Sequence, residues 1–295
     1  LVMSDIITSL DHDFFKHLAP SKGNTPAIED LLLWRHAQKG LSCFYAPFDH
    51  VNQDAKIVIV GITPGRTQMN RALNTLQTGL VNNDTIDQIL KNVKQQASLS
   101  GSMRPRIIEI LNKLGYAKAL NIDCTSSLWS ENNYLVHFCS LLKYPVFIHD
   151  KDYCGQPTLF NSGELTQLLH QEFINDLATI NPDATLVPLG EMVAKVITIL
   201  RDEGLIKQQV KTYQNKVIAP PHPSGANAES ISLLLSEQFP TLEDYQQSMY
   251  DSYLNKQSWS KKKDAKPQTE GNYKKARASR WYAVSNIRQA YGIPN

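Results

Sequence analysis

Two short apolar runs, each leading to a tight polar loop, constrain the fold of this 295-residue chain more than any other feature. The run Lys56–Val60 leads into the loop Gly61–Gly65 (GITPG), and the run Val217–Ala219 leads towards the loop His222–Asn227 (HPSGAN). A buried strand that ends in a tight loop is how α/β folds present side chains at the carboxyl edge of a sheet. The two loops therefore predict an α/β fold with a functional site at that edge.

Apolar periodicity along the rest of the chain alternates between strand and helix patterns. Further strands are expected at residues 117–122 and 185–189, whereas residues 130–163 are expected to be irregular. Helices are expected at residues 28–38, 66–100 (one or two helices), 107–114, 165–180, 191–201 and 227–238. Such alternation predicts a mainly parallel sheet that is covered by helices on both faces.

Charge is distributed unevenly along the chain. Ten of the 30 Lys and Arg residues but only two of the 28 Asp and Glu residues lie from Lys256 onward, which gives this part a net charge of +8 and residues 1–255 a net charge of −6. We expect an N-terminal helical extension over residues 1–50, an α/β domain over residues 51–250, and a basic, aromatic-containing segment over residues 251–295. A basic segment on an acidic body is typical of a protein that meets a polyanion.

The composition argues against a membrane protein, a secreted protein and a metalloprotein. No run approaches the roughly 20 apolar residues of a membrane span, and the N-terminus lacks the basic start and apolar core of a signal peptide. The four cysteines form no C-x-x-C pair, so we expect buried, reduced thiols rather than a zinc or iron–sulfur site. These features predict a cytoplasmic protein without membrane contact.

Three motifs, in this order along the chain, resemble the uracil-DNA glycosylase superfamily. Gly61–Gly65 is similar to its Gly-x-x-Pro-Gly loop, Leu189–Ala194 to its Leu-Gly-x-x-x-Ala segment, and His222–Asn227 to its His-Pro-Ser loop; the resemblance covers about residues 45–240. It implies a three-layer α/β/α sandwich with a short, mainly parallel central sheet. It also implies an enzyme that flips a nucleotide out of DNA and breaks its N-glycosidic bond.

The resemblance assigns roles to residues of the two loops. His222 would stabilise the charge that builds on the departing base, although a histidine that only caps the following helix is the alternative. The residues expected to contact DNA phosphates are Pro64, Gly65, Arg66, Ser224, Gly225 and Asn227. Ser224 and Asn227 are equally suited to cap a helix, and Arg66 to face solvent.

The first loop departs from the family at its third position. The family has an aspartate there, which orients the attacking water, or an asparagine in its mismatch-specific branch, whereas this chain has Thr63. A threonine hydroxyl can position a water but cannot act as a carboxylate base. Either Thr63 positions the water, or a carboxylate such as Asp123 arrives from elsewhere, or the protein binds a base without catalysis.

Base recognition is expected from residues near the first two strands. The resemblance implies that Asn121, at the end of the expected strand 117–122, reads the pyrimidine edge, the alternative being a turn asparagine. Ile62 would line the base pocket. The family also has a stacking aromatic after the first loop, but residues 66–115 contain none, so Tyr45 or Phe48, or else Phe138, would substitute. With Thr63, this gap suggests a modified, bulkier pyrimidine.

The basic C-terminal segment is expected to contact DNA. Lys262, Lys274 and Arg277 stand among aromatic residues, and such a mixture suits phosphate neutralisation together with base stacking. The alternative is a solvated tail that stays disordered until bound. Deleting residues 256–295 is expected to weaken DNA binding and to flatten its salt dependence.

The sequence thus predicts a monomeric, monofunctional DNA glycosylase that acts by hydrolysis, with DNA as its partner and without a metal or other cofactor. The matched loops contain no lysine, so no Schiff-base step is expected. One rival is a non-catalytic relative that senses a base in the same pocket. The other is an unrelated α/β hydrolase or nucleotide-binding enzyme, although the chain has no G-x-S-x-G, P-loop or G-x-G-x-x-G motif.

Overall fold

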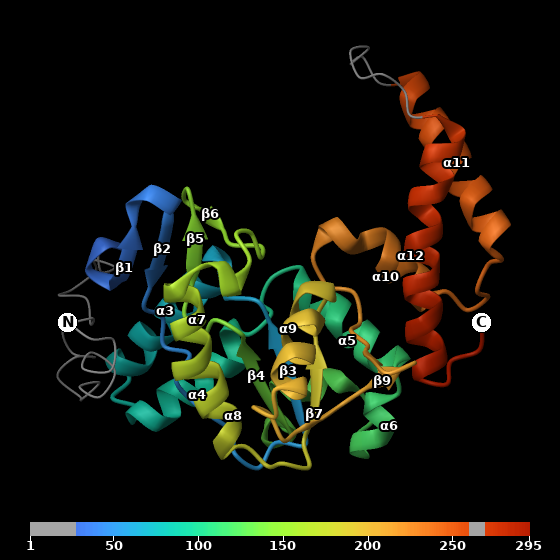
Figure 1. Cartoon of the computed structure of the whole chain (residues 1–295). Helices are drawn as coiled ribbons and strands as arrows, with labels where there is room; N and C mark the ends of the chain where they lie inside the picture. Colours follow the sequence, from blue (N-terminus) through green and yellow to red (C-terminus); the bar gives the residue numbers. More distant parts are fainter. Residues whose placement is uncertain (1–27, 260–268) are drawn as a thin grey trace.

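A four-stranded parallel sheet forms the centre of the protein in a computed structural model that describes residues 28–259 and 269–295 (Figure 1). Its strand order is β4-β3-β7-β8, and every pairing in it is parallel. The bounds of these strands are Val136–Ser140 for β4, Ile57–Gly61 for β3, Thr185–Pro188 for β7 and Gln209–Val210 for β8. The expected α/β class with a parallel sheet is therefore confirmed.

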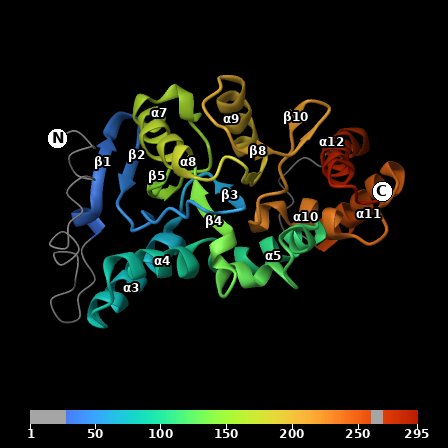
Figure 2. The ribbon, with the colours of Figure 1, turned by 90° about the horizontal axis from the view of Figure 1, so that it is seen from below.

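Helices cover both faces of this sheet, because both faces of β3 are apolar. Ile57 and Ile59 pack in one cluster with α5, whereas Val58 and Val60 pack in a second cluster with α9. Figure 2 shows α7, α8 and α9 on one side of the sheet and α4 and α5 on the other. These helices are α3 (Arg66–Val81), α4 (Ile86–Ala97), α5 (Met103–Lys113), α7 (Gly163–Leu168), α8 (Asn175–Thr179) and α9 (Glu191–Asp202).

Several expected elements are confirmed with small changes in their bounds. The polar stretch 66–100 forms α3 and α4, and the strands expected at 56–60 and 185–189 are β3 and β7. The helix expected at 165–180 is present as α7 and α8, joined by a π-helical turn at Leu169–Ile174. The periodic spacing of apolar residues in the sequence therefore identified the elements whose apolar face packs on the central sheet.

The helix expected at residues 28–38 is wrong. The described part of the N-terminal region is a short 3-10 turn, Ile28–Leu31, followed by strands of a second, antiparallel sheet in the order β1-β2-β5-β6. Gly40, two residues beyond the expected helix, lies in the turn of the β1–β2 hairpin and has a φ of +64°. The strands are β1 (Leu32–His36), β2 (Leu41–Phe44), β5 (Val146–Ile148) and β6 (Lys151–Asp152).

The strand expected at residues 117–122 is also wrong. This segment is the short helix α6, Tyr116–Leu120, because its Ala, Lys and Leu residues are strong helix formers and Gly115 before it adopts a φ of +83°. The strand that pairs with β3 on this side is β4, which lies in the stretch expected to be irregular. Because that stretch is rich in aromatic and polar residues, its three short strands, β4, β5 and β6, were not predicted from the sequence.

The strand expected at residues 217–219 lies outside the central sheet. Lys216–Val217 is β10, which pairs antiparallel with β9 (Thr212–Tyr213) in a separate hairpin. The following chain reaches the central sheet through a backbone hydrogen bond of 2.9 Å from Gly190 N–H to the Pro220 carbonyl. The histidine loop is therefore placed at the sheet edge by this contact rather than by a sheet strand.

A helical hairpin follows the histidine loop, so the described residues of the C-terminal segment are folded rather than a solvated tail. After a 3-10 turn at Gly225–Asn227 come α10 (Ala228–Leu235), α11 (Leu242–Trp259) and α12 (Glu270–Ala290). Helices α11 and α12 lie side by side, and α12 packs against α10 (Figure 1). The Arg288 side chain, which is 1% exposed, donates to the Leu234 and Ser236 carbonyls at the end of α10.

Candidate functional site

A cavity of about 500 Å³ lies at the carboxyl ends of the central strands. Gly61 at the end of β3, Ser140 at the end of β4 and Leu189 directly after β7 line it. Both predicted loops, Gly61–Gly65 and His222–Asn227, contribute lining residues and so meet at this cavity. Ligand sites commonly enclose about 300–1,000 Å³, so the size of the cavity suits a small organic ligand.

The structure brings about half of the predicted site residues together at this cavity. Those that line it are Phe48, Ile62, Thr63, Pro64, Gly65, His222, Ser224 and Asn227. The predicted residues that lie elsewhere within the described chain are Tyr45, Arg66, Asn121, Asp123, Gly225, Lys274 and Arg277. Lys262 falls outside the described residues.

His222 presents a neutral hydrogen-bond donor at the cavity wall. Its Nδ1 accepts a hydrogen bond from the Ser224 backbone N–H at 3.3 Å. Burial lowers the pKa of His222, so the neutral ring predominates at pH 7 and carries its proton on Nε2. A fixed N–H donor of this kind stabilises an anion that forms within its reach.

Gly190 fixes the position of His222. The glycine has φ +87° and ψ +163°, a conformation that is almost restricted to glycine. A Cβ atom at Gly190 would lie 3.3 Å from the Cβ of His222. We expect Gly190→Ala to lower stability by about 1–3 kcal/mol and to shift the pKa of His222, as measured by thermal unfolding and by NMR titration.

Gly204→Ala is the matched control for this prediction. Gly204 also has a positive φ, of +70°, but an added Cβ there meets no atom within 4 Å. Gly204→Ala should therefore strain the backbone without changing the pKa of His222 in the NMR titration. An unchanged His222 titration in the Gly190 variant would contradict the proposed contact.

The Thr63 hydroxyl is engaged in holding the first loop. It donates to the Tyr144 carbonyl at 2.9 Å and accepts from the Val146 N–H at 3.0 Å. These bonds tie the loop to the chain that enters β5. The single proton of the hydroxyl is therefore committed to the protein, which argues against Thr63 as the group that orients a water by donating to it.

Asp152 brings a carboxylate to the first loop from β6. Its Oδ1 accepts a hydrogen bond from the Arg66 N–H at 3.0 Å, and a Cβ on Gly65 would lie 2.6 Å from its Oδ2. Asp152 lines the cavity. The Arg66 guanidinium donates to the Asp150 carbonyl at 3.2 Å and lies 4.3 Å from the Phe147 ring centre, so this side chain is held by the β5–β6 hairpin.

Asn121 and Asp123, expected at the cavity, lie away from it. The cavity is lined by Met103 at the start of α5. This 11-residue helix spans roughly 16 Å, and Asn121 and Asp123 come after its far end, where both are exposed. Asn121 has a φ of +56° and ends α6. The expected roles of both residues depended on a strand that the chain does not form.

Two phenylalanines line the cavity, whereas Tyr45 does not. Phe48, in the chain after β2, and Phe138 of β4 both line the cavity. Phe138 is stacked on Trp129, with ring centres 4.6 Å apart. Tyr45 is buried and donates its hydroxyl proton to Asp49. Of the aromatic residues proposed for base stacking, Phe48 and Phe138 are therefore the ones that can contact a ligand.

A buried group of charged side chains, which sequence reasoning missed, reaches the same cavity. Lys94 from α4, Lys143 after β4 and Asp176 from α8 line it. Lys143 Nζ lies 2.7 Å from Glu172 and 3.0 Å from Asp176, while Lys94 Nζ donates to the Phe138 carbonyl at 2.9 Å. In sequence, Lys94 and Asp176 belong to amphipathic helical patterns in which charges are assigned to the solvent face, and Lys143 lies in the stretch expected to be irregular.

The polar residues of the second loop bond to one another. Asn227 Nδ2 donates to Ser224 Oγ at 3.1 Å, and Arg106 from α5 donates to the Pro223 carbonyl at 3.3 Å. The Ser224 side chain makes no capping bond to the following turn. The loop is thus held in place by a hydrogen bond between its own side chains and by the bond from Arg106 on α5.

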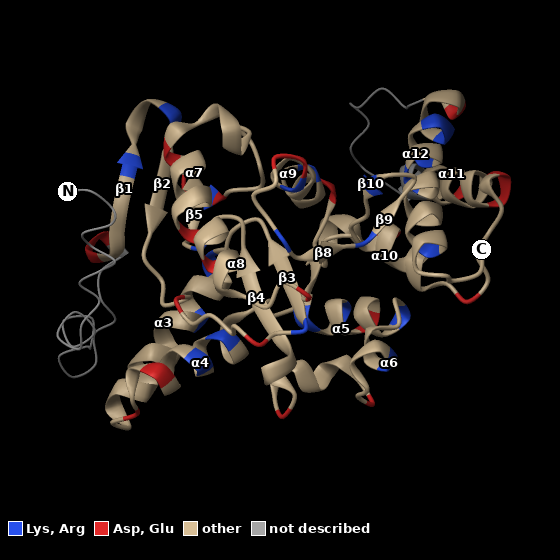
Figure 3. Cartoon of the chain, turned by 60° about the horizontal axis from the view of Figure 1, so that its bottom comes forward, with Lys and Arg blue, Asp and Glu red and all other residues tan. Residues whose placement is uncertain are grey.

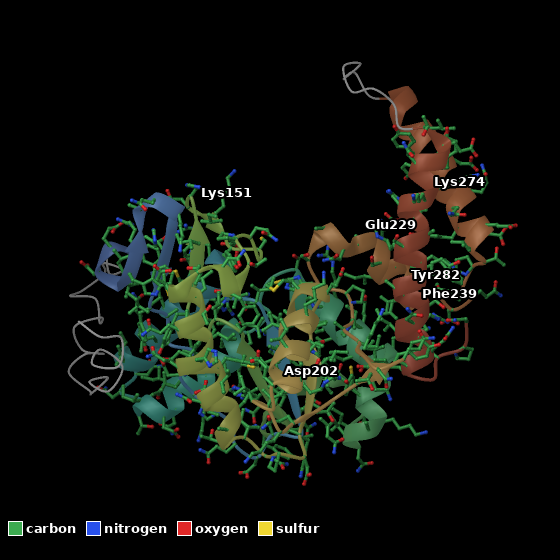
Figure 4. The ribbon with its side chains drawn as sticks, in the orientation of Figure 1. Lys151, Asp202, Glu229, Phe239, Lys274 and Tyr282 are labelled. Atoms are coloured by element: carbon green, nitrogen blue, oxygen red, sulfur yellow. The ribbon has the colours of Figure 1, made fainter. Side chains whose placement is uncertain are left out.

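Lys274 and Arg277, the two described cations predicted to bind DNA from the C-terminal segment, are engaged in ion pairs. Lys274 pairs with Glu270 at 2.7 Å, and Arg277 lies 3.3 Å from Glu229 in the first turn of α10. Arg280 also pairs with Glu229. Figure 3 marks Lys and Arg positions along α12 in blue, and Figure 4 labels Glu229 on α10 and Lys274 on α12. The two pairs of Glu229 connect α12 to α10, the helix that follows the histidine loop.

Three histidines are expected to make the protein less stable in acid. Burial lowers the pKa of His50 to about 4 and also lowers the pKa values of His137 and His222. Below the ordinary histidine pKa of 6.5 the unfolded chain binds protons that the folded chain does not, so stability falls as the pH drops from 6.5 towards 4.

Thermal unfolding between pH 4 and pH 7.5 measures this effect. His137→Asn keeps an acceptor for the Asn52 N–H and should flatten the acid slope. If the stability of His137→Asn falls with decreasing pH as steeply as that of the unmodified protein, the role of His137 in this acid sensitivity is contradicted.

The remaining expectations concern cysteines, metals and membranes. All four cysteines are free, but only Cys43 is buried, and Cys154 is exposed, so the expectation of four buried thiols is wrong. Within residues 28–259 and 269–295 no group of three or more His, Cys, Asp or Glu side chains could hold a metal ion. No helix in the same ranges has the length and hydropathy needed to cross a bilayer.

Sequence comparison places the chain beside a bacterial relative. It is 35% identical over 200 residues to the uncharacterized protein YoxB of Bacillus subtilis (strain 168), an alignment that covers 66% of this chain and 75% of YoxB. No family model matches the chain, and no solved structure matches it significantly. Identity at this level over most of both sequences requires a shared fold and ancestry, and the chain therefore belongs to the family of YoxB.

Proposed function

We propose that the protein is a monofunctional DNA glycosylase of the uracil-DNA glycosylase type, which hydrolyses the N-glycosidic bond of a flipped uracil or modified pyrimidine. The main support for this proposal is that the loops Gly61–Gly65 and His222–Asn227 meet at one cavity at the carboxyl edge of a parallel sheet. The helices on both sides of this sheet agree with the three-layer fold of that superfamily.

The chemistry of base release suits the neutral donor of His222. When water attacks the sugar C1′, the N-glycosidic bond breaks and its electron pair moves onto the base. A neutral Nε2–H that faces the base stabilises this anion in the transition state more than it stabilises the neutral ground state. The lowered pKa of His222, caused by burial, keeps the ring in the form that this role needs.

Asp152 is the best-placed group to accept the proton of the attacking water. It approaches the loop Gly61–Gly65 at Gly65, close to the position where Thr63 replaces the acidic residue of the family. Its Oδ1 is oriented by the Arg66 N–H, which leaves Oδ2 for a water. Among the other cavity carboxylates, Asp176 is paired with Lys143 and Glu191 with Lys195.

A product assay tests the proposal. Oligonucleotides with uracil or a 5-substituted pyrimidine are incubated with the protein, and abasic sites are detected by strand cleavage after alkali. Asp152→Asn, which keeps the bond from Arg66, should slow release by about 10²–10⁴-fold, whereas Glu191→Gln should not. Strand breaks without alkali, or no product from any base, would contradict the proposal.

A second candidate is a relative that binds a flipped base without releasing it. The engaged hydroxyl of Thr63 favours it, since the loop itself then supplies no group to a water. This candidate predicts binding of the same oligonucleotides with no abasic product, and no effect of Asp152→Asn on affinity. The same set of samples therefore separates the two functions.

A further inference from the structure

Lys94 is an unusual residue to find at the wall of the cavity. Its side chain comes from α4 and is only 8% exposed, yet it lines the cavity. An ammonium group has three N–H donors and no acceptor. Among the described residues, the Lys94 ammonium donates one hydrogen bond, to the Phe138 carbonyl at 2.9 Å. No carboxylate of those residues lies within 4.0 Å of the Lys94 Nζ.

The position of Lys94 follows from the topology of the sheet. Strand β4 is at the edge of the central sheet, with β3 on one side only. The Phe138 carbonyl is therefore free to accept a bond from a residue outside the sheet, and it fixes Lys94 Nζ beside the Phe48 ring, whose centre is 5.8 Å away. Two N–H donors remain for a ligand.

Lys94 stays charged at neutral pH in spite of its burial. Burial lowers its pKa to about 8, while Asp176 and other nearby groups act in the opposite direction. A pKa of about 8 leaves the ammonium form dominant at pH 7. A buried charge without a paired counter-ion is costly, and a ligand oxygen that accepts its hydrogens would relieve that cost.

Lys94 and the histidine loop approach the cavity from different sides. Figures 1 and 2 both show α4 on one side of β3 and α10, which follows the histidine loop, on the other. If His222 holds the oxygen next to the glycosidic nitrogen, the opposite edge of the base faces Lys94. That edge carries the 4-substituent of a pyrimidine, a keto oxygen in uracil-type bases and an amino group in cytosine-type bases.

We propose that Lys94 takes the place of the missing asparagine and selects pyrimidines with a keto oxygen at position 4 over those with an amino group. This inference rests on the proposed function. The ammonium donates to a keto oxygen, but it meets an amino group donor against donor, which leaves both unpaired. Asp176, which also lines the cavity, supplies an acceptor for a base N–H.

Matched pairs of bases test this selection. Single-turnover release rates are measured at pH 7 on oligonucleotides with uracil against cytosine, and with 5-hydroxymethyluracil against 5-hydroxymethylcytosine. We expect the keto member of each pair to react about 10–100-fold faster, the factor that one hydrogen bond to a charged group supplies. Lys94→Met and Lys94→Gln should bring each ratio close to one by slowing the keto member.

Lys91→Met is the matched control, because Lys91 is on the same helix but exposed and paired with Asp87; both ratios should be unchanged. Thermal unfolding identifies any variant that does not fold, and the Lys94→Gln protein then carries the test. An equal rate for both members, or a ratio that survives in the Lys94 variants, overturns the inference. If no base is released at all, the proposed function fails, and the same ratios are measured as Kd for the intact oligonucleotides.

Discussion

Replacing His222 with alanine should slow base release by about 10²–10³-fold, the loss that follows removal of one preorganised donor to a developing anion. The effect should appear in the rate of the chemical step and leave the affinity for DNA nearly unchanged, because the donor acts mainly on charge that exists only in the transition state. Single-turnover assays separate the rate from the affinity.

His170→Ala is the control for this prediction, since His170 is an exposed histidine on the π-helical turn between α7 and α8. It should leave the rate within a factor of two or so of the unmodified protein. A His222 variant that releases base at the full rate would refute the role of the imidazole. One that loses DNA affinity in parallel would indicate a binding role instead.

Replacing Lys143 with methionine is expected to have the largest effect on stability. Lys143, Glu172 and Asp176 form a buried group in which one ammonium compensates two carboxylates, and their side chains are 11%, 7% and 19% exposed. Burial disfavours the charged form of Lys143, but the two carboxylates outweigh it and hold its pKa above the ordinary value. Removal of the ammonium leaves the two carboxylates buried and uncompensated.

The expected loss for Lys143→Met is about 3–5 kcal/mol, which corresponds to a fall in Tm of roughly 6–20 °C. Lys195→Met removes an exposed partner of Glu191 and should change stability by less than about 0.5 kcal/mol. Adding Asp176→Asn to the Lys143 variant should restore part of the loss, because one of the two uncompensated charges is gone. Equal Tm values for the two lysine variants would refute the account.

The local sequence allowed the central elements of the fold to be predicted, but not its edges. Strand β3 is an almost uninterrupted apolar run, and helix α9 carries an apolar stripe at helical spacing, patterns that indicate packing in the core. Strand β4 has His137 between apolar residues and ends at Ser140, and it is a strand because it pairs with β3, a contact that local sequence does not record. The hairpin over residues 32–44 likewise has a non-local contact, because its strand β2 pairs with the distant β5.

The residues of the cavity divide in the same way: some can be found from neighbouring sequence, and others only from tertiary contacts. The two loops could be found because their glycines, prolines and histidine stand next to one another in the sequence. Asp152 and Lys94 could not be found in this way, since each reaches the cavity through tertiary contacts with residues far along the chain, Arg66 in one case and Phe138 in the other. Asn121 was chosen because it should follow a strand, and its place was lost with that strand.

The ion pairs of Glu229 have a consequence for biosynthesis. Arg280 follows Glu229 by 51 residues, so it emerges from the ribosome about 3–10 s later at ordinary rates of translation. Until then, Glu229 in the first turn of α10 lacks its two arginine partners and keeps its bond from Tyr245. We expect ribosome-stalled chains that end before Arg277 to leave residues 222–229 open to proteolysis, and chains extended beyond α12 to protect them. The helix that follows the histidine loop would thus gain its two arginine contacts only after α12 has left the ribosome.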